Sequence, residues 1–255
     1  EVVYAWRSFE AYPIAVGLTG ACSVQVPVDA RARHNLPAML DVITDATKVV
    51  VVCTPNNPTG PAVHRDELDA FLDAVPGHVL VAIDEAYREF VTDEETPDGL
   101  ELAHGRDNVV VLRTFSKAYG LAGLRIGYAV GPAPVIEAIR KCSLPFGVSN
   151  IAQAAAIASL ESEAELLERV AALVQERARV TTALADQGWA LPDAQGNFVW
   201  FPLGDATVEF AESCDAAGIS VRPFAGDGAR VTIGEQEAND VLIEVARQWR
   251  ESRSA

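Results

Sequence analysis

Three short polar segments carry the residues of this sequence that could do chemistry, and each stands just after an apolar run. They contain Asn57, Asp84 and Lys117. An acid or an amine at the end of a buried strand needs a partner for its charge. Lys117 is therefore either the anchor of an ion pair or an amine whose lowered pKa lets it act as nucleophile and base.

Each segment also has an ordinary structural interpretation. Asn56–Gly60 is typical of a turn. Asp84 could cap a helix, and Ser116 could cap another beside a salt-bridged Lys117. The presence of all three segments, in this order, favours chemistry.

The first half of the chain alternates apolar strands with helical patterns, which is typical of a parallel sheet covered by helices. We expect strands at residues 2–6, 23–28, 48–53, 79–84, 109–114 and 126–130, and helices at 9–18 and 66–74. Ligands bind such sheets at the carboxyl ends of the strands. The three segments should therefore meet along one edge of the sheet.

The second half contains an alanine-rich helical pattern, at about residues 149–185, followed by a smaller α+β unit. In that unit we expect strands at 198–203, 219–223 and 229–233, and helices at 208–217 and 236–250. These patterns predict an α/β fold. Residues 1–148 would form a large domain, with a mainly parallel sheet and helices on both faces. Residues 149–255 would supply a linking helix and a small C-terminal domain.

Composition excludes several classes of function. The chain has 255 residues, of which 49% are hydrophobic, and a formal net charge of −16, which opposes nucleic-acid binding. No apolar run is long enough to cross a bilayer and no leader is visible, so we expect a cytoplasmic protein. The cysteines stand singly, without histidines at ligand spacing, which predicts free core thiols and no metal site; they are Cys22, Cys53, Cys142 and Cys214.

The three motifs, with Arg125 eight residues after Lys117, resemble those of the fold-type I pyridoxal-phosphate-dependent aminotransferases over almost the whole chain. Pro55–Gly60, Asp84–Tyr87 and Leu112–Arg125 are similar to the aromatic (phenylalanine) amino acid and histidinol-phosphate aminotransferase branch. The resemblance implies pyridoxal 5'-phosphate as cofactor, with amino acid and 2-oxo acid substrates.

The resemblance also implies roles for the matching residues. Lys117 would form a Schiff base with the cofactor aldehyde and then move a proton between the substrate α-carbon and C4′. Asp84 would pair with the pyridine nitrogen and keep it protonated. Asn57 and Tyr87 would hydrogen-bond the ring 3-oxygen. Phe9 either stacks on the cofactor ring or packs as an ordinary helix residue.

Binding of the cofactor phosphate would use the loop that contains Lys117. Ser116 and Arg125 match the family positions, and Thr114 is a further candidate. Arginine is suited to phosphate because its guanidinium makes charge-assisted hydrogen bonds in a fixed fork.

The small domain would recognise the substrate. Arg230, in an otherwise apolar strand, matches the arginine that clamps the substrate α-carboxylate, with an edge-strand ion pair as the alternative. Asn197 would assist at the same carboxylate. Arg222 faces a substrate phosphate, a second carboxylate or only solvent.

The identity of the amino donor depends on the segment Trp6–Pro13. It carries Phe9 where histidinol-phosphate enzymes usually have a tyrosine, and so resembles the aromatic aminotransferases. We therefore expect amino transfer from phenylalanine or tyrosine to 2-oxoglutarate, through a lysine aldimine and a pyridoxamine form of the cofactor. Histidinol phosphate is the alternative donor. A cofactor-binding regulatory domain, or an inactive fragment, is the alternative of another class.

The first residues read as a buried strand, with no start methionine, which suggests a fragment. The resemblance implies an upstream segment with an N-terminal arm, the first strand of the large sheet and a Gly/Ser loop that holds phosphate. Without that segment we expect weak cofactor binding or none. The resemblance further implies a homodimer.

Overall fold

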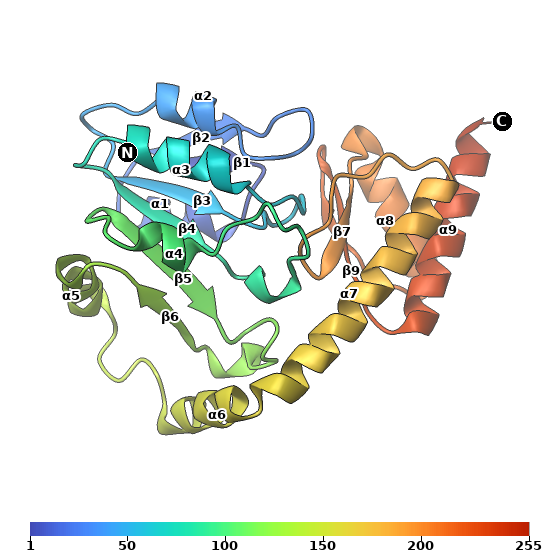
Figure 1. Cartoon of the computed structure of the whole chain (residues 1–255). Helices are drawn as coiled ribbons and strands as arrows, with labels where there is room; N and C mark the ends of the chain where they lie inside the picture. The colour runs from blue at the N-terminus through green and yellow to red at the C-terminus, as the bar shows by residue number, and fades with distance from the viewer. Residues whose placement is uncertain (255) are drawn as a thin grey trace.

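The computed structural model describes residues 1–254, except for the side chain of residue 254, and contains two sheets that lie side by side (Figure 1). The larger sheet has six strands in the order β2-β1-β3-β4-β5-β6. Their bounds are β1 Val2–Trp6, β2 Ser23–Pro27, β3 Val49–Cys53, β4 Leu80–Asp84, β5 Val109–Thr114 and β6 Gly127–Val130. The predicted strands are confirmed to within one residue at each end.

The central strands are continuous apolar runs because both faces of the large sheet are covered. β1 to β5 pair in parallel, and β6 is antiparallel to β5. In this register Cys53 lies beside Asp84, and Asp84 beside Leu112. The carboxyl ends of β3, β4 and β5 therefore share one edge, as the sequence predicts.

Helices cover the two faces of this sheet. Three of them pack on one face, through residues such as Met39, Leu68 and Leu102: α2 (Leu36–Asp41), α3 (Arg65–Ala74) and α4 (Gly99–Ala103). Two others, α1 (Ala11–Leu18) and α5 (Ala133–Cys142), pack on the opposite face, where Val16 and Ile136 contact the sheet. The α/β class with helices on both faces is thus confirmed.

The linking helix expected at 149–185 is two helices, α6 (Asn150–Glu161) and α7 (Glu163–Asp186). The prediction of a single helix was wrong because Ser162 leaves helical geometry, with φ −102° and ψ 17°. Acidic residues in the first turn of α7 favour a new N-terminus there. In Figure 1, α6 lies beside the β6 end of the large sheet, and α7 continues to the second sheet.

The second sheet has the order β7-β9-β8 and its own core, which includes Phe201, Phe210 and Leu242. Its elements are β7 (Phe198–Phe201), α8 (Thr207–Ala216), β8 (Arg222–Phe224), β9 (Gly228–Thr232) and α9 (Gln236–Ser254). The strand expected at 219–223 begins only at Arg222. The reason is that the backbone N–H of Ile219 donates to Cys214 and so closes the end of α8.

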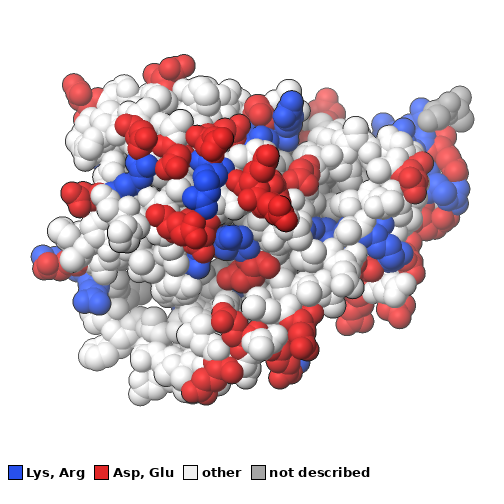
Figure 2. Space-filling model, viewed as in Figure 1, with Lys and Arg blue, Asp and Glu red and all other residues white. Residues whose placement is uncertain are grey.

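Surface features bear on three expectations. All four thiols are free, but Cys22 and Cys142 are exposed, so the prediction of core thiols was wrong for these two. Cys22 immediately precedes the edge strand β2, and Cys142 ends α5, so neither reaches a core. None of the described helices is long and apolar enough to span a membrane. On the face shown in Figure 2, basic side chains lie among acidic ones and form no stripe.

Candidate functional site

A cavity of about 290 Å³ opens at the carboxyl ends of β3, β4 and β5. The aligned ends of these strands direct the loops that follow them toward the same space. Most of the residues predicted for a cofactor site line this cavity: Phe9, Asn57, Asp84, Tyr87, Thr114, Ser116, Lys117 and Arg125. Segments that are distant in sequence thus meet around one small space.

Lys117 enters the cavity from the loop after β5, and its Nζ lies 5.3 Å from the centre of the Tyr87 ring. Loss of hydration lowers the pKa of Lys117, the charges of Arg230 and Arg125 lower it further, and Asp84 opposes the shift. Lys117 forms no ion pair within the described part of the chain. The geometry therefore favours a reactive amine over an ion-pair anchor.

Asp84 ends β4 and lines the same cavity. Burial raises the pKa of its carboxyl group, while a hydrogen bond from Tyr12, one from the backbone N–H of Ala86 and the charge of Lys117 act in the opposite direction. The Tyr12 phenol donates to Asp84 Oδ2 at 2.6 Å. Tyr12 is absent from the predicted site, because its contact with Asp84 joins residues 72 positions apart in the sequence.

Asn57 and Tyr87 form the wall of the cavity next to the second sheet. Both are buried, and Asn57 Oδ1 accepts a hydrogen bond of 2.6 Å from Arg230. Burial raises the pKa of Tyr87 to about 12, against the opposing charge of Arg230. The Tyr87 phenol therefore keeps its proton at neutral pH and is available as a donor.

Ser116 and Arg125 stand at the end of the cavity formed by the loop after β5. Arg125 has φ +52°, a left-handed conformation that is uncommon outside glycine, and its Nη1 donates to Ala122 O at 2.7 Å. The same Nη1 lies 3.5 Å from Ser116 Oγ. The Thr114 hydroxyl accepts a 3.0 Å hydrogen bond from the backbone N–H of Ser116. This loop thus turns back so that a hydroxyl and a guanidinium meet.

A second cavity, of about 200 Å³, adjoins the first and shares Phe9, Asn57 and Lys117 with it. Its remaining lining residues are Ser8, Glu10, Arg222, Phe224 and Arg230. Arg222 forms a 2.9 Å ion pair with Glu10 at the rim.

Arg230 has no acidic partner among the described residues, and its buried Nε is without a hydrogen-bond partner. Arg230 is therefore placed to bind an anion. Asn197 lines neither cavity, and its backbone oxygen accepts a hydrogen bond from Ile233.

The donor set of the first cavity fits pyridoxal 5'-phosphate. Its aldehyde requires an amine, its pyridinium nitrogen a carboxylate, its 3-oxygen hydrogen-bond donors, and its phosphate a guanidinium and a hydroxyl. The cavity offers one group of each kind, from Lys117, Asp84, Asn57 with Tyr87, and Ser116 with Arg125.

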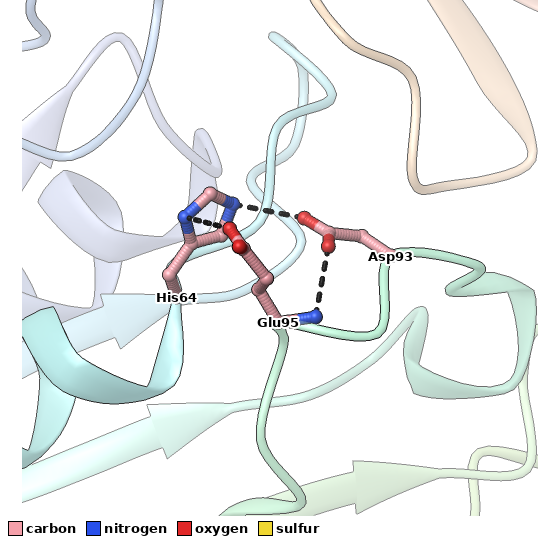
Figure 3. Close-up of side chains that lie close together, drawn as sticks. All are labelled: His64, Asp93 and Glu95. Carbon is pink, nitrogen blue, oxygen red and sulfur yellow. Dashed lines mark hydrogen bonds and ion pairs between the residues drawn. The ribbon is translucent and has the colours of Figure 1, made fainter.

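A larger cavity, of about 790 Å³, lies elsewhere and is lined by Trp6, Arg33 and Trp200 among others. His64 lines it and contacts Asp93 and Glu95 (Figure 3). His64 Nε2 lies 2.9 Å from Asp93, and Nδ1 lies 3.1 Å from Glu95. The three side chains therefore form one hydrogen-bonded group at the rim of this cavity, apart from the predicted cofactor residues.

Comparison with known proteins agrees with this donor set. Residues 1–245 match the family described as aminotransferase class I and II. The chain is 60% identical over 250 residues to the aromatic amino acid aminotransferase of Streptomyces coelicolor, covering 98% of this chain and 70% of that protein. It is 56% identical over 249 residues to the aromatic amino acid aminotransferase of Thermobifida fusca, covering 98% and 69%.

A solved structure has a similar fold. The histidinol-phosphate aminotransferase from Sinorhizobium meliloti, in complex with pyridoxal-5'-phosphate, superposes with a TM-score of 0.87 at 30% identity. The match covers 98% of this chain and 70% of that chain. The chain thus spans about 70% of the length of these relatives.

Proposed function

Because the chain belongs to the aminotransferase class I and II family, whose cofactor is pyridoxal phosphate, we propose that it transfers the amino group of phenylalanine or tyrosine to 2-oxoglutarate. The observation that carries the proposal is 53–60% identity to several aminotransferases named for aromatic amino acids. The site supports it, because Phe9 and Phe224 give the second cavity an aromatic wall.

When bound, the cofactor supplies an electron sink for the electrons of the substrate α-carbon. Asp84 would hold the pyridine nitrogen, Ser116 and Arg125 the phosphate, and Asn57 with Tyr87 the 3-oxygen, with Thr114 supporting Ser116. Phe9, which lines the cavity and is 43% exposed, would stack on the cofactor ring. Of the other polar side chains that line the cavity, Arg113 is paired with Glu85 and Asp98.

Lys117 would act on the substrate as well as on the cofactor. Lys117 lines both cavities, and its lowered pKa makes the neutral amine more accessible. In that form Nζ can take the proton from the substrate α-carbon and return a proton on the adjoining cofactor carbon.

The charges of the second cavity favour an aromatic donor over histidinol phosphate. The charge of Arg222 is compensated by Glu10, whereas Arg230 has no acidic partner among the described residues. One uncompensated guanidinium suits the single carboxylate of phenylalanine. The distal carboxylate of 2-oxoglutarate would compete with Glu10 for Arg222. A contribution of Asn197 remains a weaker proposal, because its side chain lines neither cavity.

Single-turnover rates would test the choice of donor. The absorbance of the bound cofactor is followed after mixing with phenylalanine, tyrosine or histidinol phosphate, without an oxo acid. We expect phenylalanine and tyrosine to react at least about tenfold faster than histidinol phosphate. Glu10→Gln, which frees the charge of Arg222, should shift the ratio toward the phosphate donor. A preference of the unaltered protein for histidinol phosphate would sink the proposal.

We also propose an assembly of two copies in the cytoplasm, with residues 1–148 as the cofactor domain and 149–255 as the linking and substrate-binding part. Leu144 and Phe146, which are 81% and 100% exposed, project between α5 and α6. Exposed apolar side chains grouped in this way are typical of an interface. Sedimentation of the protein should give twice the chain mass of 27.2 kDa, and a single-copy species would refute the assembly.

A further inference from the structure

Tyr12, in the first turn of α1, joins two parts of the candidate site. Its phenol donates to Asp84 Oδ2 at 2.6 Å. Its ring meets the Phe9 ring edge-on, with centroids 5.6 Å apart and planes at 89°. On its other side it packs against Tyr4 at 5.7 Å. One side chain thus contacts both the carboxylate and the aromatic residue of the cavity.

Among the described side chains that face Asp84, Tyr12 is the one that donates a hydrogen bond to it. Cys53, from the end of β3, is buried, and burial raises the pKa of its thiol to about 12, so it is neutral. Tyr87, from the loop after β4, also keeps its proton. Lys117 acts on Asp84 through its charge, without a direct contact.

Burial, with the neighbouring Cys53 and Asp84, raises the pKa of Tyr12 well above that of an ordinary tyrosine. Tyr12 therefore keeps its proton at neutral pH and remains a hydrogen-bond donor. The contact is charge-assisted, since a neutral phenol donates to a carboxylate, and such hydrogen bonds are stronger than neutral ones.

We propose that Tyr12 is a positioning residue, which holds the Asp84 carboxylate in place for the cofactor nitrogen and supports the ring of Phe9 from behind. The inference rests on the proposed function, because it assumes that Asp84 faces the pyridine nitrogen. Tyr12 itself does not line the cofactor cavity, so it acts through Asp84 and Phe9.

Titration of Asp84 in the cofactor-free protein tests the contact. The protein is prepared with ¹³C at the carboxyl carbon of its aspartates, and the NMR signal of each carboxyl is followed with pH. The signal that is lost in Asp84→Asn is assigned to Asp84. Tyr12→Phe should raise the measured pKa of Asp84 by about one to two units, the size expected for loss of a hydrogen bond to a charged group. Tyr4→Phe is the matched control, because Tyr4 lies in the same ring cluster and its hydroxyl is bonded to Gln25.

Binding of two cofactor forms tests the positioning role. One is pyridoxal phosphate, and the other is its analogue with C–H in place of the ring nitrogen. Tyr12→Phe should weaken binding of pyridoxal phosphate by about tenfold or more and change binding of the analogue by no more than about twofold. Tyr4→Phe should change neither. A merely structural role of Tyr12 would weaken both forms equally.

The outcomes separate this inference from the proposed function. If Asp84→Asn discriminates between the two cofactor forms and Tyr12→Phe does not, the role of Tyr12 is refuted while that of Asp84 stands. If Asp84→Asn does not discriminate either, the proposed arrangement of the cofactor fails. An unchanged pKa of Asp84 in Tyr12→Phe overturns the inference even where cofactor binding is too weak to measure.

Discussion

Asp84 and Glu85 are adjacent acids whose side chains lie on opposite faces of the sheet and have different partners. Glu85 is buried on the α4 side of the sheet, where it accepts two hydrogen bonds from Arg113, at 2.9 and 2.8 Å, and one from the backbone N–H of Gly99 at 2.7 Å. Asp84 lies on the α1 side, with a phenol as its side-chain partner. Among the described residues it has no ion pair. The charge of Glu85 is used within the protein, and that of Asp84 is left for a ligand.

The same division recurs one strand away. Asn56 is fully buried, and both ends of its amide are satisfied, by Ser8, His34 and Thr59 and by the backbone of Arg7. Asn57, its neighbour, lines the cavity. At both strand ends one of two adjacent residues therefore fixes the loop, and the other faces the cavity. Burial of a polar residue alone does not identify a site. In both pairs the residue that lines the cavity is the one whose side chain makes fewer hydrogen bonds within the protein.

Asp84→Asn removes the carboxylate that lines the cavity, and it should have the largest effect on activity. We expect kcat to fall by about a thousandfold, because the amide cannot keep the cofactor nitrogen charged. Burial raises the pKa of Asp84 above its unfolded value, so the stability linked to its protonated form is present at low pH and is lost as the pH rises through the folded pKa.

Asparagine does not ionise, so the Asp84→Asn variant does not lose stability in this way as the pH rises. The cofactor-free variant should therefore gain in stability relative to the unaltered protein as the pH is raised from about 4 to about 8. Steady-state kinetics and thermal unfolding at several pH values would measure the two effects. Normal turnover in the variant would contradict the assignment of Asp84.

Glu85→Gln changes the acid that is bonded within the protein, and it should affect stability more than activity. It removes the buried charge that accepts two hydrogen bonds from Arg113, while Asp98 stays as a second partner of that guanidinium, so we expect a loss of about 2 kcal/mol of unfolding free energy. Turnover per folded molecule should change much less than in Asp84→Asn. Urea denaturation followed by fluorescence would measure the loss. A variant of full stability and low turnover would reverse the roles given to the two acids.

The sequence predicts the sheet and its active edge well, because strand positions follow from short apolar runs that end at polar residues. The β3, β4 and β5 boundaries follow directly from such runs. Short helices such as α2 and α4 escape prediction, since five or six residues carry too little periodicity. Ser162, which divides the long helical pattern, carries no glycine or proline signal.

The site is predicted where a motif names it and missed where only three-dimensional contact does. Lys117 and Asp84 follow from their motifs. Tyr12 contacts Asp84 across 72 positions of sequence, which no local pattern encodes. Without the motif, residue type alone would not tell Asp84 from Glu85, since the positions of α1 and α4 on opposite faces decide which acid meets a guanidinium.

The site of covalent attachment of the cofactor tests the central claim most directly, because the chain has only three lysines: Lys48, Lys117 and Lys141. The protein is mixed with pyridoxal phosphate, reduced with borohydride, digested and examined by mass spectrometry. Lys48 and Lys141 are exposed and serve as internal controls. We predict that the reduced cofactor is found on Lys117 in clear excess over both. Labelling of Lys117 no greater than that of Lys48 or Lys141 would contradict the account.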